Sequence, residues 1–218
     1  MKLALFDLDH TLIPFDSGMA WTRHLVAQGL LPADAERVYL AYCEQYVAGT
    51  LDIHAMHRAC LLPLASVARD TLARWLGGFE ASMAPHIPAA MRALVRTHQA
   101  AGDRCVIVTA TERFIAEPFA RLFGINDLVA TEAATAHGMF TGEIEGTPCF
   151  REHKVSRVDG WLAAQGLARA AFEQTWFYSD SISDLPLLRA VTNPVAVRPD
   201  AQLRAHALQA GWDVIDST

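Results

Sequence analysis

Strand-like segments that alternate with amphipathic helical segments are the feature of this sequence that most restricts its fold. Each predicted strand is a short run of aliphatic, β-branched and aromatic residues, and the runs are Leu3–Leu8, Cys105–Thr109, Leu128–Thr131, Thr175–Ser179, Pro194–Val197 and Trp212–Ile215. Helical patterns stand between most of them, at Ile87–Ala101, Glu117–Phe123, His153–Gln165 and Leu185–Val191. Because strands joined through helices run parallel, the sequence predicts an α/β fold with helices on both faces of a parallel sheet.

The long interval between the first two strands contains no strand pattern, and helix start and stop signals divide it into several helices. We expect Ser17 to cap a helix that ends at Gly29, Pro32 to open a second one, and Asp52 and Ser66 to begin two more. The interval therefore predicts a helical cap domain at residues 16–85, inserted into a core formed by residues 1–15 and 86–218.

A second, shorter insertion has a different pattern. The stretch HGMFTGEIEGTPCF contains several glycines and places Phe140 and Ile144 among turn residues. Apolar residues that alternate between turn signals are typical of antiparallel strands. We therefore expect a β-hairpin here.

Composition and charge narrow the class of protein. Hydrophobic residues make up 52% of the 218 residues and charged ones 19%, which excludes disorder, and no apolar stretch is long enough to span a bilayer. A net charge of −6 argues against nucleic-acid binding, although a few local cations could hold a small anionic substrate. The apolar run before Asp7 is too short for a secretion signal, and the four cysteines lack C-x-x-C spacing. We expect a cytoplasmic monomer or homodimer with reduced thiols and no membrane partner.

Two aspartates follow the first predicted strand, where open α/β sheets place their ligands. Asp7 and Asp9 are separated by one leucine, and two carboxylates at one strand end resist ionising together unless a cation or a shared proton compensates. A divalent metal ion would meet this need. The alternative is a simple strand-ending turn in which Asp9 caps the next segment.

Polar residues also stand at the ends of other strands and helices. Thr109 ends the second strand, Asp180 and Asp184 follow a later one, and Lys154 lies near the start of an amphipathic helix. Each has a structural alternative: Thr109 and Glu112 match a capping box, Asp180 could cap a helix, and Lys154 could be a solvated surface lysine. Helix starts also bind phosphate, so capping and catalysis are compatible.

Taken in chain order, these polar residues resemble the four motifs of the haloacid dehalogenase superfamily. The motifs are Asp7-Leu-Asp9-His-Thr11, then Thr109, then Lys154, then Asp180-x-x-x-Asp184. The helical insertion resembles the phosphoserine phosphatase branch, and TGEIEGTPCF and SDSISDLPLL resemble its histidinol-phosphate phosphatases. The resemblance spans nearly the whole chain. One departure is Ser179, where many relatives have glycine, and we expect it to crowd the loop slightly.

The resemblance implies a Rossmann-like core and hydrolysis of a phosphomonoester. Asp7 would be the nucleophile that forms an aspartyl-phosphate, and Asp9 would protonate the leaving group and later activate water. Thr109, Ala110 and Lys154 would bind the phosphoryl oxygens.

The same resemblance implies a Mg²⁺ ion as cofactor. The Asp7 carboxylate, the Asp9 backbone carbonyl and Asp180 would hold it together with waters, and Asp184 would orient those waters. Thr11 would support the loop.

The resemblance also suggests where substrate choice is made. Asp16 falls nine residues after Asp7, where phosphoserine phosphatases have an acidic residue that meets the substrate amine; a helix-capping aspartate is the alternative. Phosphoserine would need a further cation for its carboxylate, for which Arg23 or Arg58 could serve. Histidinol phosphate has the amine without the carboxylate, so both substrates stay open.

Other interpretations remain at this point. A phosphotransferase or phosphomutase would pass the phosphoryl group to a hydroxyl, and a receiver domain would accept it as a signal, although the Asp7-x-Asp9 pair and the long insertion argue against a receiver.

His54 and His57 have metal-ligand spacing on a predicted helix, but no third ligand is evident, so we expect surface histidines.

Overall fold

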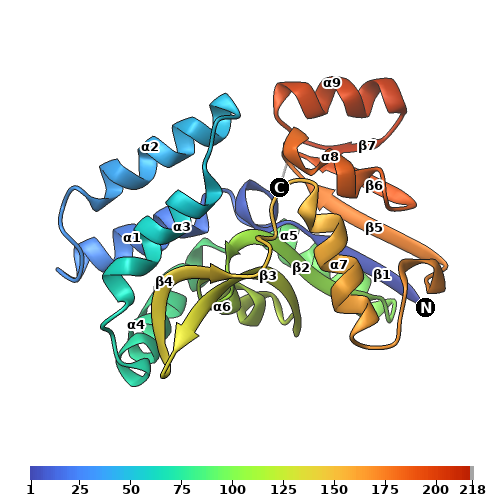
Figure 1. The fold of residues 1–218 in the computed structure, drawn as a ribbon. Helices are drawn as coiled ribbons and strands as arrows, with labels where there is room; N and C mark the ends of the chain where they lie inside the picture. The colour runs from blue at the N-terminus through green and yellow to red at the C-terminus, as the bar shows by residue number, and fades with distance from the viewer. Residues whose placement is uncertain (217–218) are drawn as a thin grey trace.

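A seven-stranded sheet forms the centre of the computed structural model, which describes residues 1–216 (Figure 1). In chain order the strands are β1 (Lys2–Phe6), β2 (Arg104–Glu112), β3 (Asp127–Ala136), β4 (Met139–Glu145), β5 (Gln174–Ser179), β6 (Asn193–Val197) and β7 (Asp213–Ile215). Their order across the sheet is β4-β3-β2-β1-β5-β6-β7. Within residues 1–216 only β4 pairs antiparallel, with β3, so the predicted parallel sheet is confirmed. A hairpin forms as predicted, but only its second arm, β4, lies in the stretch from His137 to Phe150; its first arm is the extension of β3 to Ala136.

Helices cover both faces of the sheet. Since successive side chains of β1 point to opposite faces, this strand contributes to two separate apolar cores. Ala4 and Phe6 belong to the apolar core under α5 (Ala89–Ala100) and α6 (Arg113–Phe123). Leu3 and Leu5 belong to the other core, which three helices of the second half of the chain cover: α7 (His153–Ala163), α8 (Leu185–Leu188) and α9 (Ala201–Ala210). The α/β fold class is therefore confirmed.

Four α-helices occupy the predicted cap interval, namely α1 (Ser17–Ala27), α2 (Ala35–Ala48), α3 (Ile53–Leu61) and α4 (Arg69–Met83). Asp52 caps α3 as predicted, since its carboxylate accepts hydrogen bonds from the amides of His54 and Ala55. Two other predicted starts are wrong: Asp16, not Ser17, caps α1, and α4 begins after Ala68 rather than at Ser66. Likewise, α2 begins at Ala35, three residues after Pro32.

Aromatic packing joins the first and last of these helices to the core. The Phe79 ring of α4 is fully buried, with its centroid 5.3 Å from that of Trp21 on α1 and 5.7 Å from that of Phe119 on α6. By contrast, Tyr39 is the only buried residue of α2. Figure 1 shows α2 on the outer side of α1 and α3, away from the sheet. The cap therefore has a firmly packed base and a sparsely packed outer helix.

Within residues 1–216, no helix combines the length and apolar character required to cross a bilayer. All four cysteines are free thiols.

Candidate active site

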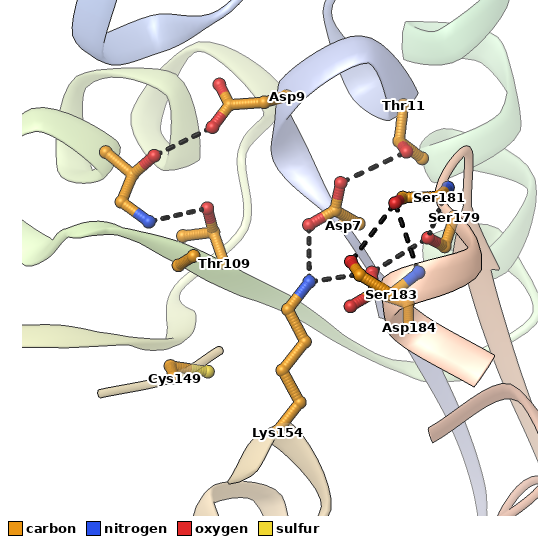
Figure 2. A network of polar contacts seen from close by, with 12 residues as sticks. Asp7, Asp9, Thr11, Thr109, Cys149, Lys154, Ser179, Ser181, Ser183 and Asp184 are labelled. Carbon is orange, nitrogen blue, oxygen red and sulfur yellow. Dashed lines mark hydrogen bonds and ion pairs between the residues drawn. The ribbon is translucent and has the colours of Figure 1, made fainter. Parts of the chain in front are cut away.

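The predicted motif residues converge at the edge of the sheet where the parallel strands end. Asp7 directly follows β1, and its amide donates a hydrogen bond to the carbonyl of Tyr178 on β5, which extends the strand pairing by one residue. A tight turn, Leu8–Leu12, then reverses the chain and brings Thr11 back over Asp7. Figure 2 shows these residues facing Asp184 and Lys154 from the opposite side of the site.

Lys154 links two of the aspartates in a buried ion triad. Its ammonium nitrogen lies 2.7 Å from Asp7 Oδ1 and 2.7 Å from Asp184 Oδ2, and the residue is only 3% exposed. Burial alone would lower the pKa of Lys154, but the carboxylates of Asp184 and Asp7 outweigh it and raise that pKa well above its usual value. Lys154 is thus a permanent buried cation and not the surface lysine of the alternative interpretation.

Thr11 joins the same network from the other side. Its hydroxyl oxygen lies 3.2 Å from Asp7 Oδ2 and 3.1 Å from Asp180 Oδ1. Because one hydroxyl has one proton, Thr11 cannot donate to both carboxylates at once. Burial, together with the neighbouring carboxylates, raises the pKa of Asp7 to about 6 and that of Asp180 to about 8. The crowding of Asp7, Asp180 and Asp184 thus opposes the ionisation of Asp7 and Asp180, and a bound cation would favour it.

Asp9 points away from this triad and toward the cap. Its Oδ1 accepts a hydrogen bond from the Ser17 amide at 2.7 Å, and its Oδ2 accepts one from the Thr111 hydroxyl at 2.8 Å. Burial is the main cause that raises the pKa of Asp9 to about 7, and the charges of Asp16 and Asp7 add to it. Adjacent carboxylates of the same motif therefore have different surroundings, one beside an ammonium and one among neutral donors.

Thr109 and Ala110 line the second strand end. The buried Thr109 hydroxyl accepts a hydrogen bond from the Thr111 amide at 3.2 Å, and Ala110 is half-buried next to it. The alternative capping box of Thr109 with Glu112 does not form, because β2 continues through Glu112 and α6 has no side-chain cap. Asp180 is not a helix cap either, since Ser181 caps the short helix that follows.

Asp16 has the structural role proposed as its alternative. Its Oδ1 accepts hydrogen bonds from the Met19 amide at 2.7 Å and from the Tyr39 hydroxyl at 2.9 Å, so it caps α1 and ties α2 to it. Arg23 and Arg58, the residues considered for a substrate carboxylate, form exposed ion pairs with Glu36 and Glu143 at 3.0 and 2.7 Å. Asp16 still lies close enough to Asp9 to raise its pKa.

Comparison with known proteins identifies the family. The haloacid dehalogenase-like hydrolase family matches residues 4–189. The chain belongs to this family. A histidinol-phosphatase from Neisseria meningitidis serogroup C (strain 8013) is 42% identical over 218 residues, which cover 99% of this chain and 98% of that protein. The predicted enzyme class and the predicted phosphatase branch of the family are therefore confirmed.

Solved structures agree with this assignment. A protein of unknown function from Bordetella pertussis Tohama I has a TM-score of 0.92 at 44% identity, covering 99% of this chain and 98% of that one. A substrate-bound phosphoserine phosphatase has a TM-score of 0.69 at 15% identity, covering 99% of this chain and 93% of that one. At that identity the second likeness concerns the fold alone, and it confirms the Rossmann-like core with an inserted helical cap.

The donor groups of this hydrolase site suit a Mg²⁺ ion. Among residues 1–216, no group of three or more histidine, cysteine, aspartate or glutamate side chains is arranged to hold a metal by itself. Mg²⁺, however, is usually bound by one or two carboxylates and several waters. Asp7 and Asp180 supply two carboxyl groups that face one hydroxyl, and a bound cation would favour the ionised form of both. The Asp9 side chain is turned away, so only its carbonyl is left for this purpose.

Ser179 is accommodated without an unpaired polar group. Its hydroxyl donates to Asp184 Oδ2 at 2.8 Å and accepts a hydrogen bond from the Ser181 amide at 3.3 Å. The Ser179 hydroxyl thus positions Asp184 for Lys154.

A contact between cap and core was missed by the sequence-based prediction. The Tyr46 hydroxyl of α2 lies 2.9 Å from Ser181 Oγ and 2.8 Å from Ser183 Oγ, on the loop that carries Asp180 and Asp184. Burial raises the pKa of Tyr46 to about 12, so its hydroxyl stays protonated and can either donate to a serine hydroxyl or accept from one. The only sequence signal for this contact is that Tyr46 lies seven residues after Tyr39, on the same helix face.

We predict that Tyr46→Phe loosens this contact and leaves the core intact. A hydrogen bond contributes about 1 kcal/mol, so amide exchange of residues 181–184 should accelerate about fivefold. Hydrogen–deuterium exchange mass spectrometry measures this. Tyr42→Phe, the same change on the same helix, is the matched control and should leave the exchange rate unchanged; equal rates in both variants would contradict the role of Tyr46.

Proposed function

We propose that this hydrolase removes the phosphoryl group from a small, amino-bearing phosphomonoester through an aspartyl-phosphate on Asp7, with Mg²⁺ as cofactor. The observation that carries the proposal is the placement of Asp7. Lys154 contacts one of its carboxylate oxygens and Thr11 the other, so its orientation is fixed before substrate arrives. A carboxylate held beside a permanent ammonium is suited to attack an anionic phosphate.

In the first step, an Asp7 oxygen attacks phosphorus and the bond to the leaving-group oxygen breaks. Lys154 and the Thr109 hydroxyl are placed to meet the negative charge on the phosphoryl oxygens, together with the backbone around Ala110. In the second step, water attacks the aspartyl-phosphate, which releases inorganic phosphate and regenerates the Asp7 carboxylate.

Asp9 is placed to move the protons of both steps. With its pKa raised to about 7, a substantial fraction of Asp9 is protonated near neutrality and can protonate the departing alkoxide. The resulting carboxylate can then take a proton from the attacking water. Ser17 and Thr111 hold the carboxyl group in one orientation during both transfers.

Asp7, Asp180 and the Asp9 carbonyl would hold the Mg²⁺ ion, with Asp184 orienting its waters. When bound, the ion supplies positive charge that offsets the repulsion between substrate and carboxylates. Asp184 itself is fixed by Lys154 and Ser179.

The amine of the substrate would meet Asp16 in the proposed cap domain, residues 16–85. Asp16 and Asp9 together favour a leaving group with a positive charge. Arg23 and Arg58 are each already paired with a glutamate, which supports histidinol phosphate over phosphoserine, because phosphoserine also needs a cation for its carboxylate. The name of the Neisseria relative points the same way.

The structure and the comparisons bear differently on the two alternative functions, a receiver domain and a phosphotransferase. A receiver domain is ruled out by the family match and by the helical insertion. A phosphotransferase of the same fold uses the same first step and differs only in the acceptor. Release of inorganic phosphate with no phosphorylated product from an added alcohol would support the hydrolase.

We predict that Asp7→Asn abolishes turnover while the fold persists, because an amide is not a nucleophile toward phosphorus. Phosphate release from p-nitrophenyl phosphate measures the loss, and circular dichroism checks the fold. In the wild type, rapid acid quench and peptide mass spectrometry should find a phosphoryl group on the peptide that contains Asp7. Asp159→Asn is the matched control, since Asp159 is half-buried, pairs with Arg169 and makes no contact with the motif residues. Retained activity in Asp7→Asn would end the covalent scheme.

Metal dependence gives a second prediction. EDTA should stop hydrolysis and excess Mg²⁺ should restore it, whereas Asp180→Asn should raise the Mg²⁺ concentration for half-maximal rate roughly tenfold or more. Calorimetric titration of Mg²⁺ into both proteins gives an independent measure of binding. Full activity in chelator would refute the metal role.

The role of Asp16 is tested by Asp16→Asn, since asparagine also caps helices well and thus spares α1. Loss of a charged hydrogen bond costs about 1.5–3 kcal/mol, so KM for histidinol phosphate should rise roughly ten- to hundredfold. KM for p-nitrophenyl phosphate, which has no amine, is the internal control. A parallel rise in both KM values would remove Asp16 from substrate recognition.

A further inference from the structure

A cavity of about 190 Å³ lies inside the cap, behind the wall of the candidate active site. Helices α1, α2 and α3, the segment between α1 and α2, and the junction of β2 with α6 line it, and it is open to solvent on the side of the exposed Asp34 and Val38. Its walls are mainly apolar and aromatic, and the principal residues are Trp21, Leu25, Val38, Tyr39, Tyr42 and Glu112. An apolar protein cavity of 150 Å³ binds benzene, so this one has room for a single ring with a short substituent.

Glu112 is the charged group on the inner wall of this cavity. It is only 3% exposed, and its Oε1 lies 2.7 Å from Nδ1 of the fully buried His57. This burial corrects the expectation of a surface histidine at position 57, whereas His54 is exposed as predicted. The mechanism proposed above uses neither Glu112 nor His57.

The pair cannot satisfy all of its own polar groups. Within residues 1–216, the second ring nitrogen of His57, Nε2, is a buried atom without a hydrogen-bond partner. If His57 is neutral and donates from Nδ1, Glu112 is a buried anion without a countercharge. If His57 is protonated, its Nε2–H is a buried donor left unpaired. A cationic ligand beside Glu112 relieves the cost of the first state, because it supplies the missing countercharge.

The other cavity walls do not supply the missing positive charge. The titratable side chains that line it besides Glu112 are Asp34, which is exposed, and those of Tyr39, Tyr42 and Cys60. Burial, with a contribution from Glu112, raises the pKa of Cys60 well above its usual value, so this group is a neutral thiol. The walls therefore combine carboxylates with aromatic rings, the surroundings that bind organic cations.

We propose that this cavity is a binding site for a small monocyclic organic cation, whose ring packs against Trp21, Tyr39 and Tyr42 and whose ammonium or imidazolium group meets Glu112. The site is distinct from the phosphoryl-transfer centre. Tyr39 forms the boundary between them, since its ring lines the cavity and its hydroxyl donates to Asp16. An occupant of the cavity therefore contacts the residue that holds Asp16 in place.

Calorimetric titration of the full chain with benzylamine, which is charged at neutral pH, tests the proposal without turnover. Benzyl alcohol, a neutral probe of nearly the same shape, is the matched ligand control. We expect benzylamine to bind at least tenfold more tightly than benzyl alcohol, and Glu112→Gln to remove this difference. Gln keeps the size of the side chain and an oxygen for His57. Equal binding of the two probes by the wild type, or no binding, would overturn the proposal.

Two further variants locate the binding. Asp16→Asn should retain benzylamine binding; loss of binding in this variant, with binding kept in Glu112→Gln, would place the probe in the substrate site and refute the cavity assignment. Val38→Phe fills the cavity from its partly exposed rim and should weaken the binding of both probes at least tenfold. This variant tests the site even if Glu112→Gln does not fold. None of these outcomes depends on phosphatase activity.

Discussion

The buried contact of Lys154 with Asp7 and Asp184 is the interaction on which the geometry of the site depends. Three segments that are distant in sequence meet at this ammonium: the end of β1, the start of α7 and the loop after β5. Removal of one partner from a buried ion pair costs about 3–5 kcal/mol, because the other charge is left uncompensated. A loop that moved away would incur this cost, so the triad fixes the relative positions of the loops and not only of the charges.

The two ends of the cap are held by different physical interactions. The base, at α1 and α4, is anchored by the buried rings of Trp21 and Phe79, which need no directional bond. The outer helix α2 buries only the Tyr39 ring and is otherwise held by polar contacts: the hydroxyls of Tyr39 and Tyr46 and the exposed ion pair of Glu36 with Arg23. Hydrogen bonds exchange readily with water, whereas buried aromatic area does not, so α2 is the part of the cap best suited to move as substrate enters and phosphate leaves.

The local sequence pattern predicted some features of the fold and of the site correctly and missed others. The strands and the motif positions at their ends could be predicted, because burial on two faces imposes apolar runs and parallel strands bring their ends to one edge. The predicted cap of α1, Ser17, is one residue too late, since Asp16 and Ser17 are both good capping residues. Only the structure shows that Asp16 accepts from the Met19 amide, whereas the Ser17 amide donates to Asp9. Glu112 matched a capping box, but its burial against His57 depends on a helix 55 residues earlier in the chain. Such contacts leave no periodic signal in either segment.

Ser17 shows how the cap and the chemistry are connected. Its amide, the first of α1, donates to the Asp9 carboxylate, and its hydroxyl contacts Thr111, which donates to the other oxygen of Asp9. The surroundings that set the pKa of Asp9 are thus built partly by the cap and partly by β2. A displacement of α1 would weaken the hydrogen bond from Ser17, which lowers the pKa of Asp9. It would also expose Asp9 to water and so reduce the desolvation, which raises that pKa. The position of the cap and the proton affinity of Asp9 are therefore coupled through one backbone amide.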